Sequence, residues 1–265
     1  MREQAEVLVE AVSAFCERRF AEVQDIAALA AGPLSGPSPR RSDLAIERHC
    51  LELLASADPP LAGAGVVVAP RVLSDEPLWL EWWLAGPDEA PGDAQRLAAD
   101  VNPDSVTFRD YTSLAWFEEP QRTGLRCITG PYVDYLCTDQ YTLTITSPLT
   151  SPLTSPHTSP LTSPLTSPLT SPLTSPLGSA DRFLGVAGVD VLARWFEQHL
   201  FRVADERGDL DEGCVVVNRS GRVVACPSGL WVTGDLIREL GPDQDTAGWE
   251  VSECPGTPFA VGRRC

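Results

Sequence analysis

Apolar side chains recur every three or four positions through the first 31 residues of the chain. This spacing places them on one stripe of a helix, with glutamate and arginine on the remaining surface. The pattern therefore predicts a long amphipathic helix over residues 1–31, which Gly32-Pro33 is expected to end. The stripe is formed by Val7, Leu8, Ala11, Val12, Phe15, Val23, Ile26, Ala27 and Ala30.

Shorter helices and strands are predicted along the rest of the chain. Asp43 precedes a helical pattern and is expected to cap it. The apolar periodicity predicts helices over residues 44–55, 110–119, 192–204 and 234–240. Apolar runs and alternation predict strands at 65–69, 96–101, 126–129 and 141–146, a hairpin over 214–225 and a last strand within 249–261.

The segment Leu78–Leu84, LWLEWWL, is unusually rich in tryptophan. It is too aromatic for an ordinary exposed helix and too short to span a membrane, so its rings must be buried. Two interpretations remain open, a staple in the hydrophobic core and a wall of a ligand pocket.

Between Thr146 and Gly178 the chain repeats the four residues Thr-Ser-Pro-Leu, with His157 in place of one leucine. Proline at every fourth position removes backbone donors and excludes a helix interior or a central strand. Residues 147–177 are therefore expected to form a polyproline-like or disordered loop. The segments YTLTIT before it and RFLGVAGVDV after it are expected to pair as a hairpin, because the entropy of loop closure grows slowly with length.

Acidic residues outnumber basic ones by 37 to 20, which gives a formal charge of −17 over 265 residues. Such a chain repels phosphate backbones and anionic lipid, so neither a nucleic-acid nor a membrane partner is expected.

The first residues lack the features of a signal peptide, and no apolar run is long enough for a membrane span. Because the eight cysteines are scattered and without metal-ligand spacing, we expect reduced thiols in a soluble, cytoplasmic protein.

The common catalytic motifs are missing from the sequence, including GxSxG, HExxH, the P-loop and GxGxxG. Outside the repeat the only histidines are His49 and His199, each within a helical pattern. We therefore expect that the protein is not an enzyme and that it holds no cofactor and no metal. A cysteine hydrolase that uses Cys127 or Cys137 is kept as an alternative.

Two segments, residues 129–146 and 182–200, together resemble the sensory core of Cache domains, the PAS-like modules of bacterial chemoreceptors and sensor kinases. In that family a W-[YF]…PY-x-D segment leads into a strand, a loop and a strand that ends in G-V-x-G-x-D. The order and spacing match once the repeat is removed. The matching positions are Trp116, Phe117, Pro131, Tyr132, Asp134, Gly185, Val186, Gly188 and Asp190.

The resemblance implies an α+β, PAS-like Cache fold, with a long N-terminal helix, a central antiparallel β-sheet, a pocket over the sheet and an abbreviated second lobe. The expected units are a helix over 1–31, a sensor core over 43–204 that the repeat at 147–177 interrupts, and a small C-terminal lobe over 205–265.

The family's pocket is lined by aromatic residues and holds a ligand ammonium group on a carboxylate. By position, Asp190 is expected to be that carboxylate, with Asp134 beside it, although either aspartate also suits a capping or turn role. Thr129-Gly130-Pro131 is expected to form a tight turn that presents Tyr132. The expected ligand-binding residues are Trp116, Phe117, Tyr132, Asp134, Tyr135 and Asp190.

Leu114 stands two residues before Trp116, where amino-acid-binding members of the family carry an arginine for the ligand carboxylate. Nearby basic residues that could replace it are Arg109, Arg122 and Arg126. A carboxylate among aromatic rings favours a cationic amine through ion pairing and cation–π attraction. The expected ligand is therefore a small amine, an amino-acid-like molecule or an organic acid.

The expected function is sensory recognition of such a metabolite, with the signal passed to a separate regulator or output protein. The alternative is a non-catalytic interaction or scaffold protein. In that case the helix over residues 1–31 would pair with its copy in a homodimer through Val7, Val12 and Phe15.

Overall fold

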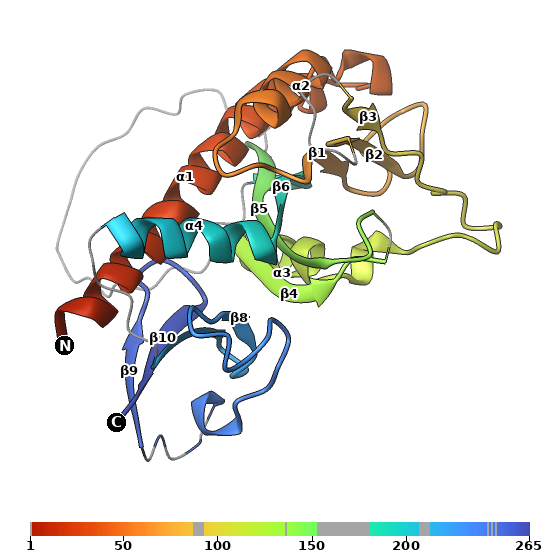
Figure 1. The fold of residues 1–265 in the computed structure, drawn as a ribbon. Helices are drawn as coiled ribbons and strands as arrows, with labels where there is room; N and C mark the ends of the chain where they lie inside the picture. Colours follow the sequence, from red (N-terminus) through yellow and green to blue (C-terminus); the bar gives the residue numbers. More distant parts are fainter. Residues whose placement is uncertain are drawn as a thin grey trace, which may run out of the picture.

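The computed structural model describes residues 2–86, 93–135, 137–152, 181–206, 213–242, 244, 246 and 248–265 (Figure 1). These residues form an α+β fold with two antiparallel sheets, and one long helix packs against both sheets. The fold class expected from the sequence is therefore confirmed.

The predicted N-terminal helix is present as α1, Arg2–Leu34. Pro33 lies in its last turn, and the Ser35 N–H donates to the Ala31 carbonyl oxygen at 3.0 Å just beyond it. Its apolar stripe packs on strands of both sheets, and Val12 and Phe15 are buried within the chain. The face that the sequence left open for a homodimer is thus part of the protein's own core.

The larger sheet has six strands in the order β3-β2-β1-β6-β5-β4, and every neighbouring pair is antiparallel. The two central strands are buried along almost their whole length, which explains their nearly continuous apolar and glycine sequences. The strands are β1 Gly63–Val68, β2 Trp79–Leu84, β3 Gln95–Arg96, β4 Cys127–Val133, β5 Tyr141–Pro152 and β6 Asp181–Leu192.

The strands that flank the Thr-Ser-Pro-Leu repeat pair with each other, as the sequence predicts. However, residues 147–152 of the repeat belong to β5, so the prolines do not exclude the whole tract from a strand. β4 pairs with β5 only as far as Thr146, and Pro148 therefore has a neighbouring strand on one side alone. Proline is tolerated there because its missing N–H has no ladder partner to lose. The rest of the repeat lies outside the described residues.

The remaining helices differ in detail from the expectation. Asp43 does not cap α2, because its carboxylate accepts from the Arg40 N–H at 2.8 Å and closes a separate 3-10 turn. The helix expected over 110–119 is divided at the extended residue Leu114, and the one expected over 234–240 is only a 3-10 turn. No helix among the described residues has the length and apolar character needed to cross a lipid bilayer. The helices are α2 Glu47–Ser56, α3 Ala115–Thr123 and α4 Ala193–Glu206.

The smaller sheet has the strand order β8-β7-β10-β9. The predicted hairpin is present as β7, Cys214–Asn218, and β8, Val223–Ala225. The C-terminal segment holds two strands instead of the one expected, β9, Trp249–Glu253, and β10, Phe259–Arg264. The chain reverses between them at Gly256, whose φ is +75°.

The two faces of the larger sheet carry different partners. Successive residues of a strand point to opposite faces. On β5, Ser147 Oγ accepts from Gln24 of α1 at 3.2 Å, whereas Thr146 Oγ1 donates to the Trp116 carbonyl oxygen of α3 at 2.9 Å. Helix α1 therefore covers one face, and α3 covers part of the other.

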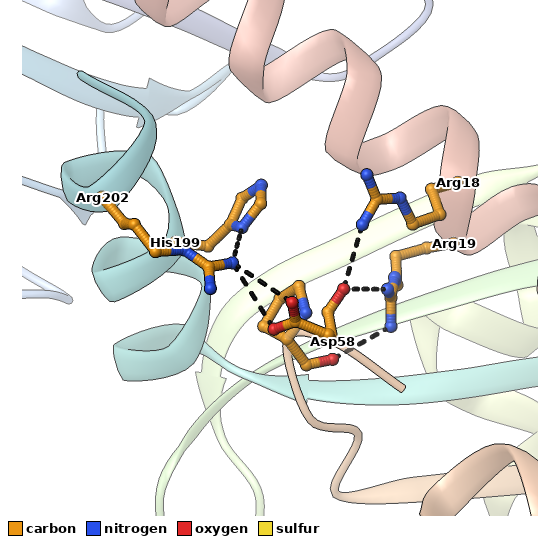
Figure 2. Close-up of polar contacts among 6 residues, drawn as sticks. Arg18, Arg19, Asp58, His199 and Arg202 are labelled. Atoms are coloured by element: carbon orange, nitrogen blue, oxygen red, sulfur yellow. Dashed lines mark hydrogen bonds and ion pairs between the residues drawn. The ribbon is translucent and has the colours of Figure 1, made fainter. Parts of the chain in front are cut away.

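Figure 2 shows the polar contacts that join α1, α4 and the loop between α2 and β1. Arg18 Nη1 and Arg19 Nη2 donate to the Asp58 carbonyl oxygen at 3.0 and 3.2 Å. From α4, Arg202 forms an ion pair with the Asp58 carboxylate at 3.4 Å. Arg18 and Arg202 are exposed, whereas the Arg19 side chain is fully buried. These contacts fix the loop against both helices.

Arg19→Ala is expected to lower the free energy of unfolding by about 2–4 kcal/mol. The substitution removes the ion pair with Glu22, which lies 3.2 Å away, and the hydrogen bonds to the carbonyl oxygens of Asp58 and Pro59 in the loop. Arg18→Ala, on the adjacent but exposed residue, should cost less than about 1 kcal/mol. Urea unfolding of both variants at pH 7 measures the difference, and equal costs would contradict the structural role given to Arg19.

Candidate functional site

A cavity of about 80 Å³ lies on the α3 face of the larger sheet. Strands β1, β2, β4, β5 and β6 and the residues around the start of α3 contribute to its wall. Its wall combines apolar and aromatic side chains with a polar group of hydroxyls and carboxylates. The lining residues are Val67, Leu80, Trp82, Leu97, Leu114, Trp116, Tyr132, Asp134, Cys137, Thr144 and Asp190.

Two carboxylates, Asp134 and Asp190, are buried in this wall. Thr144 Oγ1 donates to Asp190 Oδ1 at 2.6 Å. The Tyr132 hydroxyl lies 2.6 Å from the same Thr144 oxygen and must donate to it, because the threonine has only one hydrogen to give. Asp134 Oδ1 accepts from the Cys137 N–H at 3.3 Å, so Asp134 holds the turn after β4 as well as lining the cavity.

Asp190 titrates far from its ordinary range. Burial raises its pKa to about 7, and the Asp134 carboxylate also raises it, while the hydrogen bond from Thr144 and the nearby Trp82 N–H act in the other direction. Burial, assisted by the negative charge of Asp190, also raises the pKa of Tyr132 and of the Cys137 thiol well above their ordinary values. Near neutral pH the cavity therefore holds a partly protonated Asp190 beside a protonated phenol and thiol.

The Trp82 indole occupies space that two glycines leave open. A Cβ at Gly63 would lie 2.5 Å from Trp82 Nε1, and one at Gly188 would lie 3.3 Å from Cη2 of the same ring. Trp82 is 5% exposed, belongs to the core and lines the cavity, so both interpretations of the tryptophan-rich segment hold for it. Although its N–H lies near enough to Asp190 to lower that pKa, it completes no hydrogen bond with any described residue.

A bulge in β4 aims Tyr132 at the site. The structure has no tight turn at Thr129-Gly130-Pro131, because β4 pairs with β5 on both sides of Gly130-Pro131. Gly130 has a φ of +130°, and a Cβ there would lie 2.5 Å from the Thr142 carbonyl oxygen. The extra residue in β4 redirects the strand. Tyr132 thereby reaches Thr144 across the pair.

Four of the six residues expected from the sequence come together in the cavity, namely Trp116, Tyr132, Asp134 and Asp190. Their part in binding stays a prediction. Phe117 is fully buried against Phe183, with ring centroids 5.5 Å apart, because successive residues of a helix point about 100° apart. Tyr135 is 82% exposed in the turn after β4. Neither of these two lines the cavity.

Other lining residues were not predicted, and one of them, Thr144, carries a signal in the sequence. The three threonines of YTLTIT alternate with Leu143 and Ile145, and all three threonines are buried, which marks a polar stripe on one face of β5. Leu114 lines the cavity at the position where the resemblance implies an arginine. The replacements considered for it lie elsewhere, since Arg122 pairs with Glu119, Arg126 pairs with Glu17, and Arg109 is exposed.

The fold has counterparts among solved structures, although no family model matches the sequence and no curated protein matches it. The extracellular domain of a protein described as a histidine kinase, mmHK1S-Z3, superposes with a TM-score of 0.57 at 13% identity, over 98% of this chain and 92% of that one. An extracellular ligand-binding receptor from Desulfohalobium retbaense gives a TM-score of 0.49 at 10% identity, over 98% of this chain and 39% of that one. The first of these two comparisons shows that the chain shares its fold with the extracellular domain of mmHK1S-Z3, which agrees with the fold that the Cache resemblance implies.

The state of Asp190 should set part of the pH dependence of stability. Because its pKa is raised in the folded protein, folding favours the protonated form, so this contribution is complete below about pH 4 and is lost as the pH rises through 7. Asp190→Asn keeps the side chain neutral and retains an oxygen for Thr144 to donate to. The variant is expected to gain up to about 4 kcal/mol over wild type between pH 4 and pH 8, measured by urea unfolding. A difference that stays constant with pH would contradict the raised pKa.

The space beside Gly63 gives a second expectation. Gly63→Ala should lower the free energy of unfolding by about 1–3 kcal/mol, because the new methyl group forces Trp82 or its strand to move. Gly32→Ala is the matched control, since this helical glycine has nothing within 4 Å of its Cβ position and should be neutral or stabilising. Thermal unfolding of the two variants compares them directly, and an unchanged Gly63→Ala would be the contradicting result.

Proposed function

We propose that this chain is a small-molecule-binding sensory domain whose cavity takes a small cationic amine at Asp190. The supporting observation is that two buried carboxylates share the cavity, while none of the described residues that line it is Arg, Lys or His. A cation favours the ionised form of both carboxylates. An organic acid, the other class that the sequence left open, would add a negative charge beside Asp134 and Asp190, so we favour the amine.

The rest of the wall suits an ammonium group with a short apolar tail. Trp82, Trp116 and Tyr132 place aromatic rings around the carboxylates, and such rings attract cations. Drug-sized ligands occupy pockets of about 300–1,000 Å³. A volume of about 80 Å³ instead suits a head group of a few heavy atoms.

Cys127 and Cys137 do not suit the nucleophile of a cysteine hydrolase. The nucleophile of such an enzyme is a thiolate. Burial is the main cause that raises the pKa of Cys127 and of Cys137, so both thiols keep their protons at neutral pH. Cys137 lies in the cavity, but its neighbours there are carboxylates that disfavour a second negative charge.

The sensory part of the proposal rests on the fold shared with the extracellular domain of mmHK1S-Z3. Binding would shift a conformational or assembly equilibrium that a separate output protein reads. A scaffold protein, the second candidate from the sequence, would have no need for a buried carboxylate with a polarised hydroxyl chain.

We place the protein in the cytoplasm as part of the same proposal. All eight cysteines are free thiols, five of them buried, which suits a reducing compartment. The structural counterparts are extracellular domains, so fractionation of cells that express the tagged native chain is the relevant test.

Amine binding should depend on pH through Asp190. Only the ionised carboxylate attracts the cation, and with a pKa of about 7 the apparent affinity is expected to be about tenfold lower at pH 6 than at pH 8. Isothermal titration calorimetry with n-propylamine measures this, because the amine itself stays charged over that range. Asp190→Asn should weaken binding at pH 8 by about 30-fold or more, since the charge-assisted bond is lost.

Propionate, an anion of similar size, serves as the matched ligand control and should not bind. Binding of propylamine that is equal at pH 6 and pH 8 and survives Asp190→Asn would rule out the proposed site. No binding of any small amine to wild type would favour the scaffold role.

A further inference from the structure

A basic cluster lies between α1 and α4, outside the cavity at Asp190 (Figure 2). It consists of Arg18 and Arg19 from α1 and of His199 and Arg202 from α4. Burial lowers the pKa of the His199 imidazole, and all three guanidinium groups lie close enough to lower it further. This local concentration of positive charge contrasts with the formal charge of −17 of the whole chain.

The carboxylates beside the basic cluster offset only part of its charge. Glu22 pairs with the buried Arg19 at 3.2 Å, and burial raises the pKa of Glu22, which favours its uncharged form. The Asp58 carboxylate pairs with Arg202 at 3.4 Å, whereas charge-assisted hydrogen bonds are typically about 2.7–2.9 Å long. The Asp58 side chain is also 71% exposed, and an exposed ion pair of this length is weak. An anion from solution can therefore compete with Asp58 for Arg202.

The exposed arginines of the cluster, Arg18 and Arg202, use few of their hydrogen-bond donors. A guanidinium group carries N–H donors on each of its nitrogens and has no acceptor. Arg18 engages only Nη1, which donates to the Asp58 carbonyl oxygen at 3.0 Å, and Arg202 engages only Nη2. Their other nitrogens have no acceptor among the described residues. Because both arginines contact Asp58, an ion that takes the place of its carboxylate would lie within reach of both.

His199 adds a donor whose identity follows from its neighbour. Its Nδ1 lies 3.2 Å from Arg202 Nη2, and Nδ1 must accept because the arginine can only donate. The lowered pKa favours the neutral ring, which therefore carries its hydrogen on Nε2. Figure 2 shows this second nitrogen pointing away from Arg202 and Asp58, and it has no hydrogen-bond partner among the described residues. The Nε2–H group is thus a further unused donor of the cluster.

We propose that the basic cluster binds a small oxyanion, a phosphoryl group, which displaces the Asp58 carboxylate and bridges Arg18 of α1 to Arg202 and His199 of α4. Guanidinium groups present paired donors that match the oxygens of a phosphate. The net charge of the chain opposes long polyanions, whereas a small ion responds mainly to charges within about 8 Å. This inference goes beyond the proposed function and does not depend on it.

Asp58→Asn is the most specific test, because it removes the competing charge and keeps the carbonyl oxygen to which Arg18 and Arg19 donate. Isothermal titration calorimetry with inorganic phosphate at pH 7.5 and low ionic strength should show saturable binding to wild type. Asp58→Asn should bind phosphate about threefold more tightly or better, whereas Arg18→Gln and Arg202→Gln should each bind it about tenfold more weakly or worse.

Arg48→Gln is the matched control, because Arg48 is an exposed arginine that pairs with Glu52 at the far end of α2 from the Asp58 loop. It removes the same charge and should leave the affinity within about twofold of wild type. Thermal unfolding without phosphate checks that each variant is folded.

Ethyl phosphate distinguishes the two sources of a phosphoryl group. If wild type binds this monoester as tightly as inorganic phosphate, the site serves a phosphorylated metabolite. If it binds the monoester about tenfold more weakly or worse, the site serves free phosphate.

Three results would overturn the proposal. The first is a wild type that shows no saturable binding of phosphate at millimolar concentration. The second is a loss in Arg18→Gln and Arg202→Gln that is no larger than in Arg48→Gln, because binding would then reflect net charge alone. The third is weaker binding to Asp58→Asn, because the carboxylate would then support the ion instead of competing with it.

Discussion

The Asp190 carboxylate is buried near the centre of a six-stranded sheet, where the Thr144 hydroxyl donates to it and another carboxylate lies in the same cavity. An ionised carboxylate in such surroundings is unfavourable without a partner, and its pKa rises as a result. The protein therefore holds a group that a cation can bind and neutralise. The aromatic wall, the hydroxyl chain from Tyr132 and the lack of a basic side chain among the described lining residues all affect the energy of this one group.

Contacts from the rest of the fold hold the elements around Asp190 in place. Helix α1 packs on both sheets, and the buried Arg19 fixes the loop that leads into β1. On the cavity side, Gly63 and Gly188 leave room for Trp82. The Asn218 side chain donates to the Gly130 carbonyl oxygen at 2.8 Å and so connects the bulge behind Tyr132 to the smaller sheet.

Much of this could be predicted from the sequence, because the pattern of each element agrees with its burial. The long helix and the β5–β6 hairpin follow from local periodicity and from the low cost of loop closure. The position of Asp190 beside aromatic side chains follows from the resemblance to Cache domains. The predictions that were wrong concern the direction of a side chain or the extent of a strand, both of which depend on tertiary contacts. Phe117 and Trp116 are neighbours in sequence, yet the helix turns only Trp116 toward the cavity. Tyr135 follows Asp134 but points to solvent, and Pro148 enters β5 because β4 ends before it.

Asp190 is proposed to bind a cation, and the pKa of its own carboxyl group tests this most directly. A carbon-13 NMR titration of aspartate-labelled protein, assigned with Asp190→Asn, should give a pKa of about 7 without ligand and a value at least one unit lower with saturating propylamine. A carboxyl group that already titrates near pH 4 in the free protein, or whose pKa does not respond to the amine, would contradict the account.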